Sequence, residues 1–140
     1  MGGVSPTHEA ALREFGMELG IAFQMVDDSL DYSSSEEQFG KSIGHDLEEG
    51  KITLPLIHAL KKCTTDERRQ IAEVVRKELI TKDDFKMIFD IVGVYGGLEY
   101  SLDMAKEYSS RAKKCLDIFE NSPEKAALLN LADYIVTRAK

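Results

Sequence analysis

The acidic segment Asp27-Asp28-Ser29-Leu30-Asp31 offers the clearest chemistry in this sequence of 140 residues. It places three carboxylates within five residues, at the end of an apolar run that has helical spacing. On a helix that turns by roughly 100° per residue, these acids fall within an arc of about 100°. They can therefore converge on a divalent cation, and such hard oxygen ligands suit Mg²⁺. A solvated acidic helix end is the plain alternative for this pattern taken alone.

A second informative segment follows closely and contains two lysines, Lys41 and Lys51. Three glycines in it permit tight turns and close approach of the backbone to a ligand. They are Gly40, Gly44 and Gly50. Lysine side chains act as point charges toward phosphate groups. Acids that can hold a metal, followed by such lysines, indicate a site for a metal-bound diphosphate.

Together the two segments read FGMELGIAFQMVDDSLDY over residues 15–32 and GKSIGHDLEEGKITLP over residues 40–55. This pattern resembles the trans-type polyprenyl diphosphate synthases, and within that family the long-chain bacterial members, which include octaprenyl diphosphate synthases. Ser42 departs from the pattern, since many members have proline there, but both lysines keep their register. The rest of the chain is compatible with the family's C-terminal helices and contains no motif of similar strength.

The resemblance implies a metal role for four acids. Asp27 and Asp31, one helical turn apart, would be the main Mg²⁺ contacts. Asp28 would act through the water shell of the metal. Asp46 would support the lysine loop or the metal's waters.

The resemblance also assigns roles to three further side chains. Lys41 and Lys51 would contact the diphosphate of the allylic substrate. Gln24, one turn before the acids, would line the reaction cavity, where its amide dipole can help to stabilise a cation. The alternative for Gln24 is an ordinary glutamine on a helix surface.

The implied reaction joins isopentenyl diphosphate to an allylic prenyl diphosphate. The allylic diphosphate ionises with the help of Mg²⁺, the double bond of isopentenyl diphosphate attacks the cation, and a proton is lost. Such a site must stabilise a leaving group of high negative charge.

Only one aspartate-rich motif is present, although the family has two and the first is followed by an arginine pair. Neither Asp83-Asp84 nor Arg68-Arg69 supplies the missing motif. The start Met1-Gly2-Gly3 is consistent with a cut through a longer chain. We therefore expect residues 1–140 to be a single helical domain, the C-terminal half of a polyprenyl synthase, without synthase activity on its own.

Composition narrows the function classes. A net charge of −7 argues against a nucleic-acid partner and against electrostatic attraction to anionic membranes. Two cysteines suit a reducing compartment. With no signal peptide and no apolar run near the ~20 residues of a spanning helix, the sequence predicts a cytoplasmic protein. A lipid product would still require transient membrane contact, and the family resemblance implies a homodimer at full length.

Hydrophobic spacing predicts an all-α protein, an antiparallel helical bundle. The family resemblance implies that this bundle has the fold of the C-terminal half of the isoprenoid synthases. Ser5 or Thr7 should cap a first helix that runs to about residue 33, and later caps should be Thr65, Thr81 and Ser122. The apolar stripe of the first helix should comprise Leu12, Phe15, Leu19, Ala22, Phe23, Val26 and Leu30. The last helix should bury Leu128, Leu131, Ala132, Ile135 and Val136.

Three other hypotheses about the function are compatible with the sequence. A class I terpene synthase relative would use the same ionisation chemistry but normally lacks the lysine segment. A non-catalytic subunit of a heteromeric prenyl synthase would be expected to have degenerate acids and lysines. A helical scaffold with a fortuitous acid patch would show no metal-dependent binding of diphosphate.

Overall fold

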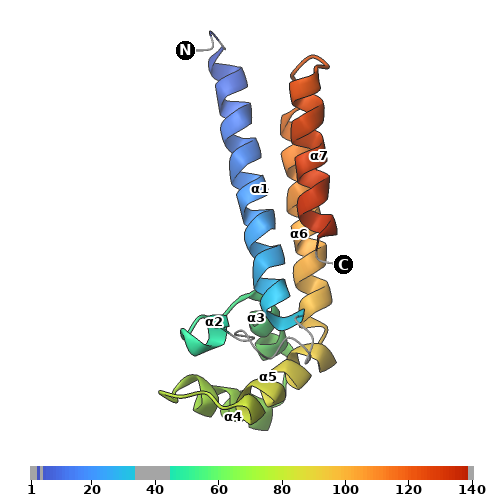
Figure 1. Ribbon diagram of the computed structural model, residues 1–140. Coiled ribbons are helices and arrows are strands. Elements are labelled where there is room, and N and C mark those ends of the chain that lie inside the picture. The colour runs from blue at the N-terminus through green and yellow to red at the C-terminus, as the bar shows by residue number, and fades with distance from the viewer. Residues whose placement is uncertain (1–2, 4, 34–44, 139–140) are drawn as a thin grey trace. The chain divides into compact units, whose positions relative to one another are not determined.

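The structure, a computed structural model, describes residues 3, 5–33 and 45–138 (Figure 1). Over these residues it contains seven helices and no strand, which confirms the all-α prediction. The helices are α1 (Pro6–Ser33), α2 (His45–Glu48), α3 (Leu54–Lys62), α4 (Thr65–Val75), α5 (Lys82–Val94), α6 (Gly97–Cys115) and α7 (Pro123–Thr137). The predicted site residue Lys41 lies outside the described residues.

The chain divides into two compact units. One comprises residues 1–26 and 102–140, and the other comprises residues 27–101. Helices α1 and α6 each contribute residues to both units. The three predicted aspartates and Lys51 belong to the second unit, whereas Gln24 belongs to the first.

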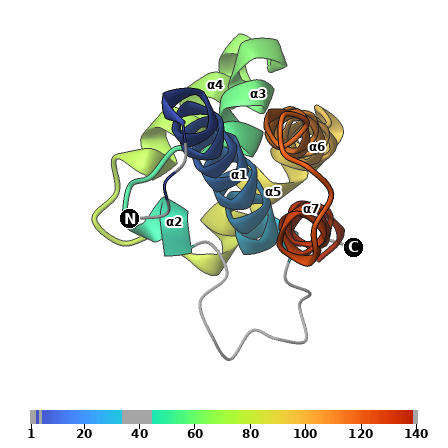
Figure 2. The same cartoon turned by 90° about the horizontal axis from the view of Figure 1, so that it is seen from above.

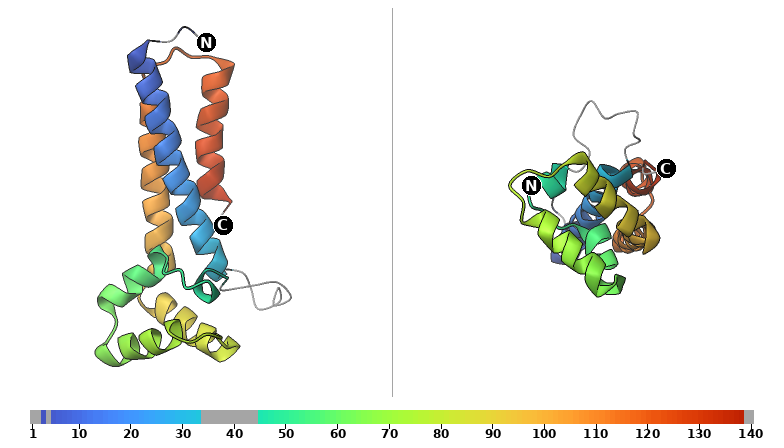
Figure 3. Two further views of the ribbon diagram at one scale, coloured as in Figure 1. Left: turned by 90° about the vertical axis from the view of Figure 1, so that its left-hand side faces the viewer. Right: turned by 90° about the horizontal axis from the view of Figure 1, so that it is seen from below.

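In the first unit, α1, α6 and α7 lie side by side (Figures 2 and 3). The buried seam of α1 alternates steps of four and three residues, through Phe15, Leu19, Ala22 and Val26. The buried positions of α6 in this unit include three small residues, Ala105, Ser109 and Ala112. The Ser109 hydroxyl donates a hydrogen bond of 2.8 Å to the Ala132 carbonyl in α7. Small side chains allow helices to approach closely, so packing here leaves little room for larger ones.

The stripe predicted for α1 is too wide. Leu12 and Phe23 are 39% and 42% exposed, because only the narrow seam faces neighbouring helices. Leu131 of α7, predicted to be buried, is likewise 45% exposed. The Phe23 ring is covered in part by the Arg138 guanidinium, 4.2 Å from the ring centroid.

Local side-chain contacts explain where most of the helices begin. Ser5, one of the two caps predicted for the start of α1, accepts a hydrogen bond from the His8 amide. Ser122 caps α7 in the same way. The start of α4 differs from the prediction, because Thr64 rather than Thr65 forms the capping box with Glu67.

The second unit has its own apolar core, and α5 packs against both α3 and α4. The core residues are Tyr32, Leu47, Leu56, Ala59, Ile71, Val74, Ile88, Ile91 and Val92. The chain turns from α5 into α6 at Gly96, whose φ of +67° lies in the left-handed region that favours glycine. A Cβ at the next residue, Gly97, would clash with the Pro55 carbonyl oxygen and lie 2.9 Å from Val92 Cγ1.

Gly97→Ala should therefore destabilise the chain by about 1–3 kcal/mol, because the added methyl group must displace backbone. Gly16→Ala is the matched control, since a Cβ at Gly16 of α1 meets no atom within 4 Å. That control should stabilise the chain by roughly 0.5–1 kcal/mol through helix propensity. Urea unfolding measures both changes. Equal midpoints for the two variants would contradict the close contact.

The capping box of α5 should make stability sensitive to acid. Thr81 caps α5 together with Asp84, as predicted, and the Asp84 carboxylate also lies 2.6 Å from Lys77 Nζ. The Lys77 ammonium and then the Thr81 amide lower the pKa of Asp84 from 3.8 to about 2. Because the folded pKa lies below the unfolded one, this contribution is present above about pH 4 and is lost as pH falls toward 2.

Thermal unfolding of Asp84→Asn and wild type at several pH values measures this contribution. The difference between them should shrink as pH falls from 5 to 2. Asp83→Asn, at the neighbouring position, should show no such convergence. A constant difference for Asp84→Asn across that range would contradict the capping role of the ionised carboxylate.

Candidate functional site

The three predicted aspartates lie in the last two turns of α1, in the second unit. Asp27 is exposed, and Asp28 and Asp31 are half-buried. Ser29 and Tyr32 of the same turns are 1% exposed. The end of α1 is thus anchored on one face by buried residues while its carboxylates stay accessible.

Asp31 is joined to the segment that contains Asp46. The Asp46 backbone N–H donates a hydrogen bond of 3.3 Å to Asp31 Oδ2. This amide lies in the first turn of α2, where backbone N–H groups have no partner within the helix. A carboxylate is a favourable acceptor at such a position. Two acids that the sequence singled out separately are therefore adjacent in the structure.

A glycine turn brings Lys51 back to Asp46. Gly50 has a φ of +74° and its amide donates to the Leu47 carbonyl at 3.0 Å. The Lys51 amide donates to the Asp46 carbonyl at 2.7 Å, which completes a Schellman turn at the end of α2. Backbone geometry therefore returns Lys51 to the first turn of α2.

The Lys51 side chain contacts two carboxylates. Its Nζ lies 2.5 Å from Glu49 Oε2 and 3.4 Å from Asp46 Oδ1. Glu49 first, and Asp46 to a smaller extent, raise the pKa of Lys51 because both carboxylates stabilise its ammonium form. Sequence reasoning missed Glu49, although its place two residues before Lys51 across a turn glycine was a usable signal.

The phenol of Tyr32 lies among the same acids. The pKa of Tyr32 is raised from 10.0 to about 12, mainly by burial. The Thr53 hydroxyl lowers this pKa, and the carboxylates of Asp31, Asp46 and Asp28 raise it. Its ring stacks on Phe85 of α5, with centroids 6.2 Å apart. Tyr32 is therefore a buried packing residue whose phenol is close enough to these carboxylates to be influenced by their charge.

The structure thus brings together Asp31, Asp46 and Lys51 by direct contacts. Gln24 is an exposed residue of α1, one turn before Asp27. Within the described residues, no group of three or more His, Cys, Asp or Glu side chains is placed to hold a metal ion by itself. The donor chemistry nevertheless fits Mg²⁺, which is usually bound by one or two carboxylates together with waters and substrate phosphates.

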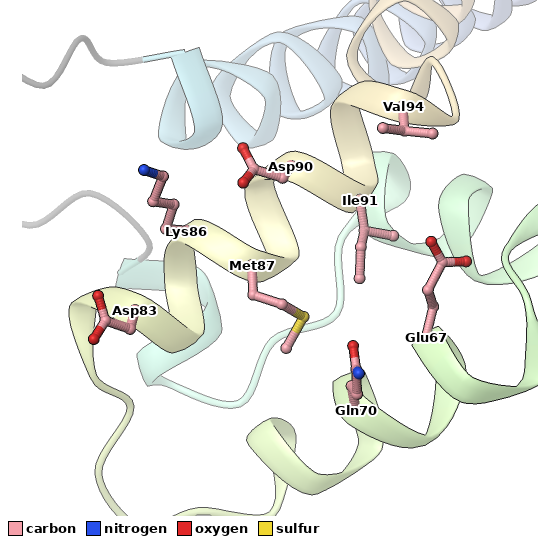
Figure 4. Close-up of a pocket in the computed structure, with 8 residues that line it drawn as sticks. All are labelled: Glu67, Gln70, Asp83, Lys86, Met87, Asp90, Ile91 and Val94. Atoms are coloured by element: carbon pink, nitrogen blue, oxygen red, sulfur yellow. The ribbon is translucent and has the colours of Figure 1, made fainter.

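A separate hollow of about 470 Å³ lies between α4 and α5 (Figure 4). It is lined by Glu67, Gln70, Asp83, Lys86, Met87, Asp90, Ile91 and Val94, none of which the sequence proposed as site residues. Glu67 already has structural partners there, since it completes the capping box of α4 and accepts a 2.7 Å hydrogen bond from Tyr95.

Comparisons with known proteins define the class. Residues 1–92 match the polyprenyl synthetase family model, and the chain belongs to that family. It is 34% identical to the octaprenyl diphosphate synthase of Escherichia coli (strain K12) over 99% of this chain and 42% of that protein. It is 35% identical to a short chain isoprenyl diphosphate synthase of Methanothermobacter thermautotrophicus, over 99% of this chain and 42% of that protein.

Solved structures agree. A decaprenyl diphosphate synthase from Rhodobacter capsulatus superposes with a TM-score of 0.90 at 34% identity, over 99% of this chain and 43% of that one. A polyprenyl synthase from Caulobacter crescentus, solved with calcium and isoprenyl diphosphate, superposes with a TM-score of 0.87 at 36% identity. The match covers 99% of this chain and 42% of that one. The helices match the C-terminal part of the isoprenoid synthase fold, as predicted. The chain spans about two fifths of the length of these relatives.

One further finding concerns membranes. Every helix in the part of the chain that the structure describes is too short or too polar to cross a bilayer.

Gly50→Ala should disturb the lysine turn, because a residue with a Cβ is strained at a φ of +74° by about 1–2 kcal/mol. Gly50→Asn is the matched control, since asparagine tolerates this conformation better. The measurement is amide hydrogen exchange at Lys51. Exchange should be faster in the alanine variant and closer to wild type in the asparagine variant. Indistinguishable rates in all three proteins would contradict the turn.

Proposed function

We propose that this chain is the C-terminal portion, one helical domain over residues 1–140, of a polyprenyl diphosphate synthase. The longer enzyme would condense isopentenyl diphosphate with an allylic diphosphate. The observation that supports this most strongly is the connection from Asp31 through Asp46 to Lys51. It joins a carboxylate at the acidic end of α1 to a lysine whose positive charge can bind a phosphate group.

Asp27 and Asp31 would hold Mg²⁺ from one face of α1, with Asp28 acting through bound water. Bound Mg²⁺ would neutralise charge on the substrate diphosphate. Asp46 serves this arrangement by positioning, since its amide fixes Asp31 and its carboxylate approaches Lys51.

Lys51 would bind the diphosphate by exchanging its exposed pairing with Glu49 for substrate oxygens. Exposed ion pairs contribute little stability, so this exchange costs little. Lys41 would supply a second positive charge. Both lysines stabilise negative charge that grows on the leaving group as the allylic carbon–oxygen bond breaks.

The chemistry then proceeds on the substrates. The electron pair of the broken carbon–oxygen bond remains on the diphosphate, and an allylic cation is left. The double bond of isopentenyl diphosphate attacks this cation, and a proton passes to the released diphosphate. The Gln24 amide would help to stabilise the cation by its dipole.

The finer features of the function are also proposals. Similarity to an octaprenyl diphosphate synthase supports a long-chain product, and comparable similarity to a short chain isoprenyl diphosphate synthase supports a shorter product as the alternative. We propose a cytoplasmic homodimer at full length, with transient membrane contact when a long product is released.

Diphosphate binding tests the proposal. Titration calorimetry of the chain with inorganic diphosphate should show binding that requires Mg²⁺. Asp27→Asn should weaken it about tenfold or more, because a metal contact is lost. Asp83→Asn, which alters the other aspartate pair, should leave it unchanged. A wild-type chain that binds no diphosphate with Mg²⁺ present would refute the proposed site.

Catalysis needs more than this site. Because the chain has one aspartate-rich motif where the family has two, incubation with labelled isopentenyl diphosphate and an allylic diphosphate should give no elongated product. Extraction and counting of the prenyl products measures this. Elongation by the 140-residue chain would show that a single motif suffices.

A further inference from the structure

Two buried hydroxyl groups lie beside the proposed site and have no assigned role. The first belongs to Tyr32, which is 1% exposed and follows Asp31 directly in the chain. Its oxygen is buried and makes no hydrogen bond of normal length with the described residues. An unpaired buried hydroxyl costs free energy, so its placement requires a reason.

The second hydroxyl belongs to Thr53, at the N-cap position of α3. Threonine in this position normally accepts a hydrogen bond from the helix, yet Thr53 makes no such cap. Its Oγ1 is buried and also lacks a hydrogen-bond partner of normal length in the described part of the chain. Thr53 lies close enough to Tyr32 to act on its phenol.

We propose that Tyr32 and Thr53 are positioning residues for the diphosphate site, whose hydroxyls bond to each other directly or through one water. The inference rests on the proposed function, because it concerns the turn that presents Lys51. A small shift or a single water satisfies both groups at once.

The reason for such a bond lies in how the Lys51 segment is attached. Asp31 holds one end of this segment through the Asp46 amide. Tyr32, the next residue of α1, would hold the other end through Thr53. Two adjacent residues of one helix would then fix both ends of residues 46–53. A segment held at one end could swing, whereas one held at both ends keeps Lys51 near the acids.

Tyr32→Phe and Thr53→Val remove one hydroxyl each and keep most of the side-chain volume. Each should weaken Mg²⁺-dependent binding of inorganic diphosphate about three- to tenfold, since one net hydrogen bond changes an equilibrium by roughly that factor. The double variant should be no weaker than either single one, because both changes remove the same bond. Titration calorimetry gives the three ratios.

Amide hydrogen exchange provides a second readout that does not depend on diphosphate. In both single variants the Asp46 and Lys51 amides should exchange faster, while the thermal midpoint shifts little. Tyr134→Phe, at a residue that is 65% exposed, is the matched control and should change neither measurement.

The outcomes separate the inference from the proposed function. In one outcome the wild-type chain binds diphosphate, and Tyr32→Phe and Thr53→Val change neither this binding nor amide exchange. That result would overturn the positioning role and leave the proposed function standing. Additive losses in the double variant would also overturn it, since the residues would then act independently. A third outcome is that the wild-type chain binds no diphosphate, while the Asp46 and Lys51 amides exchange faster in the single variants. That result would support the bond between Tyr32 and Thr53 and refute the proposed site.

Discussion

The hydrogen bond from the Asp46 amide to Asp31 is the interaction on which the candidate site depends. It joins the acidic end of α1 to the segment that presents Lys51. The bond uses one carboxylate oxygen of Asp31 and leaves Asp27, one turn earlier, accessible on the helix surface. The structural role of Asp31 is therefore compatible with the metal-binding role proposed for the acids.

The apolar core of the second unit positions the two residues that form this hydrogen bond. Tyr32 directly follows Asp31 in the chain, and Leu47 directly follows Asp46. Both residues are 1% exposed and belong to one apolar cluster. Burying such side chains contributes about 1.5–3 kcal/mol each, more than the one hydrogen bond they position. Packing thus sets the register of α1 against α2, and the polar contact follows from it.

Sequence reasoning predicted much of this arrangement because the informative residues are close in the chain. The helix starts at Ser5, Thr81 and Ser122 follow from local side-chain hydrogen bonds, and all three are confirmed. The burial of Leu12 and Phe23 was predicted wrongly, since periodicity shows that a helix is amphipathic but not how wide a face its neighbours cover. The pairing of Lys51 with Glu49 is local and was missed, although the two residues flank a turn glycine. The absence of a side-chain cap at Thr53 is a tertiary effect that no local pattern predicts.

The turn at Gly50 bears on the affinity of the proposed diphosphate site. Its two backbone hydrogen bonds hold the main chain at Lys51 in place before any ligand arrives. Less conformational entropy is then lost on binding than if a loose loop had to close around a phosphate. The lysine side chain still has to rotate, but the backbone beneath it is preorganised. A modest number of contacts can therefore suffice for recognition at this end of the molecule.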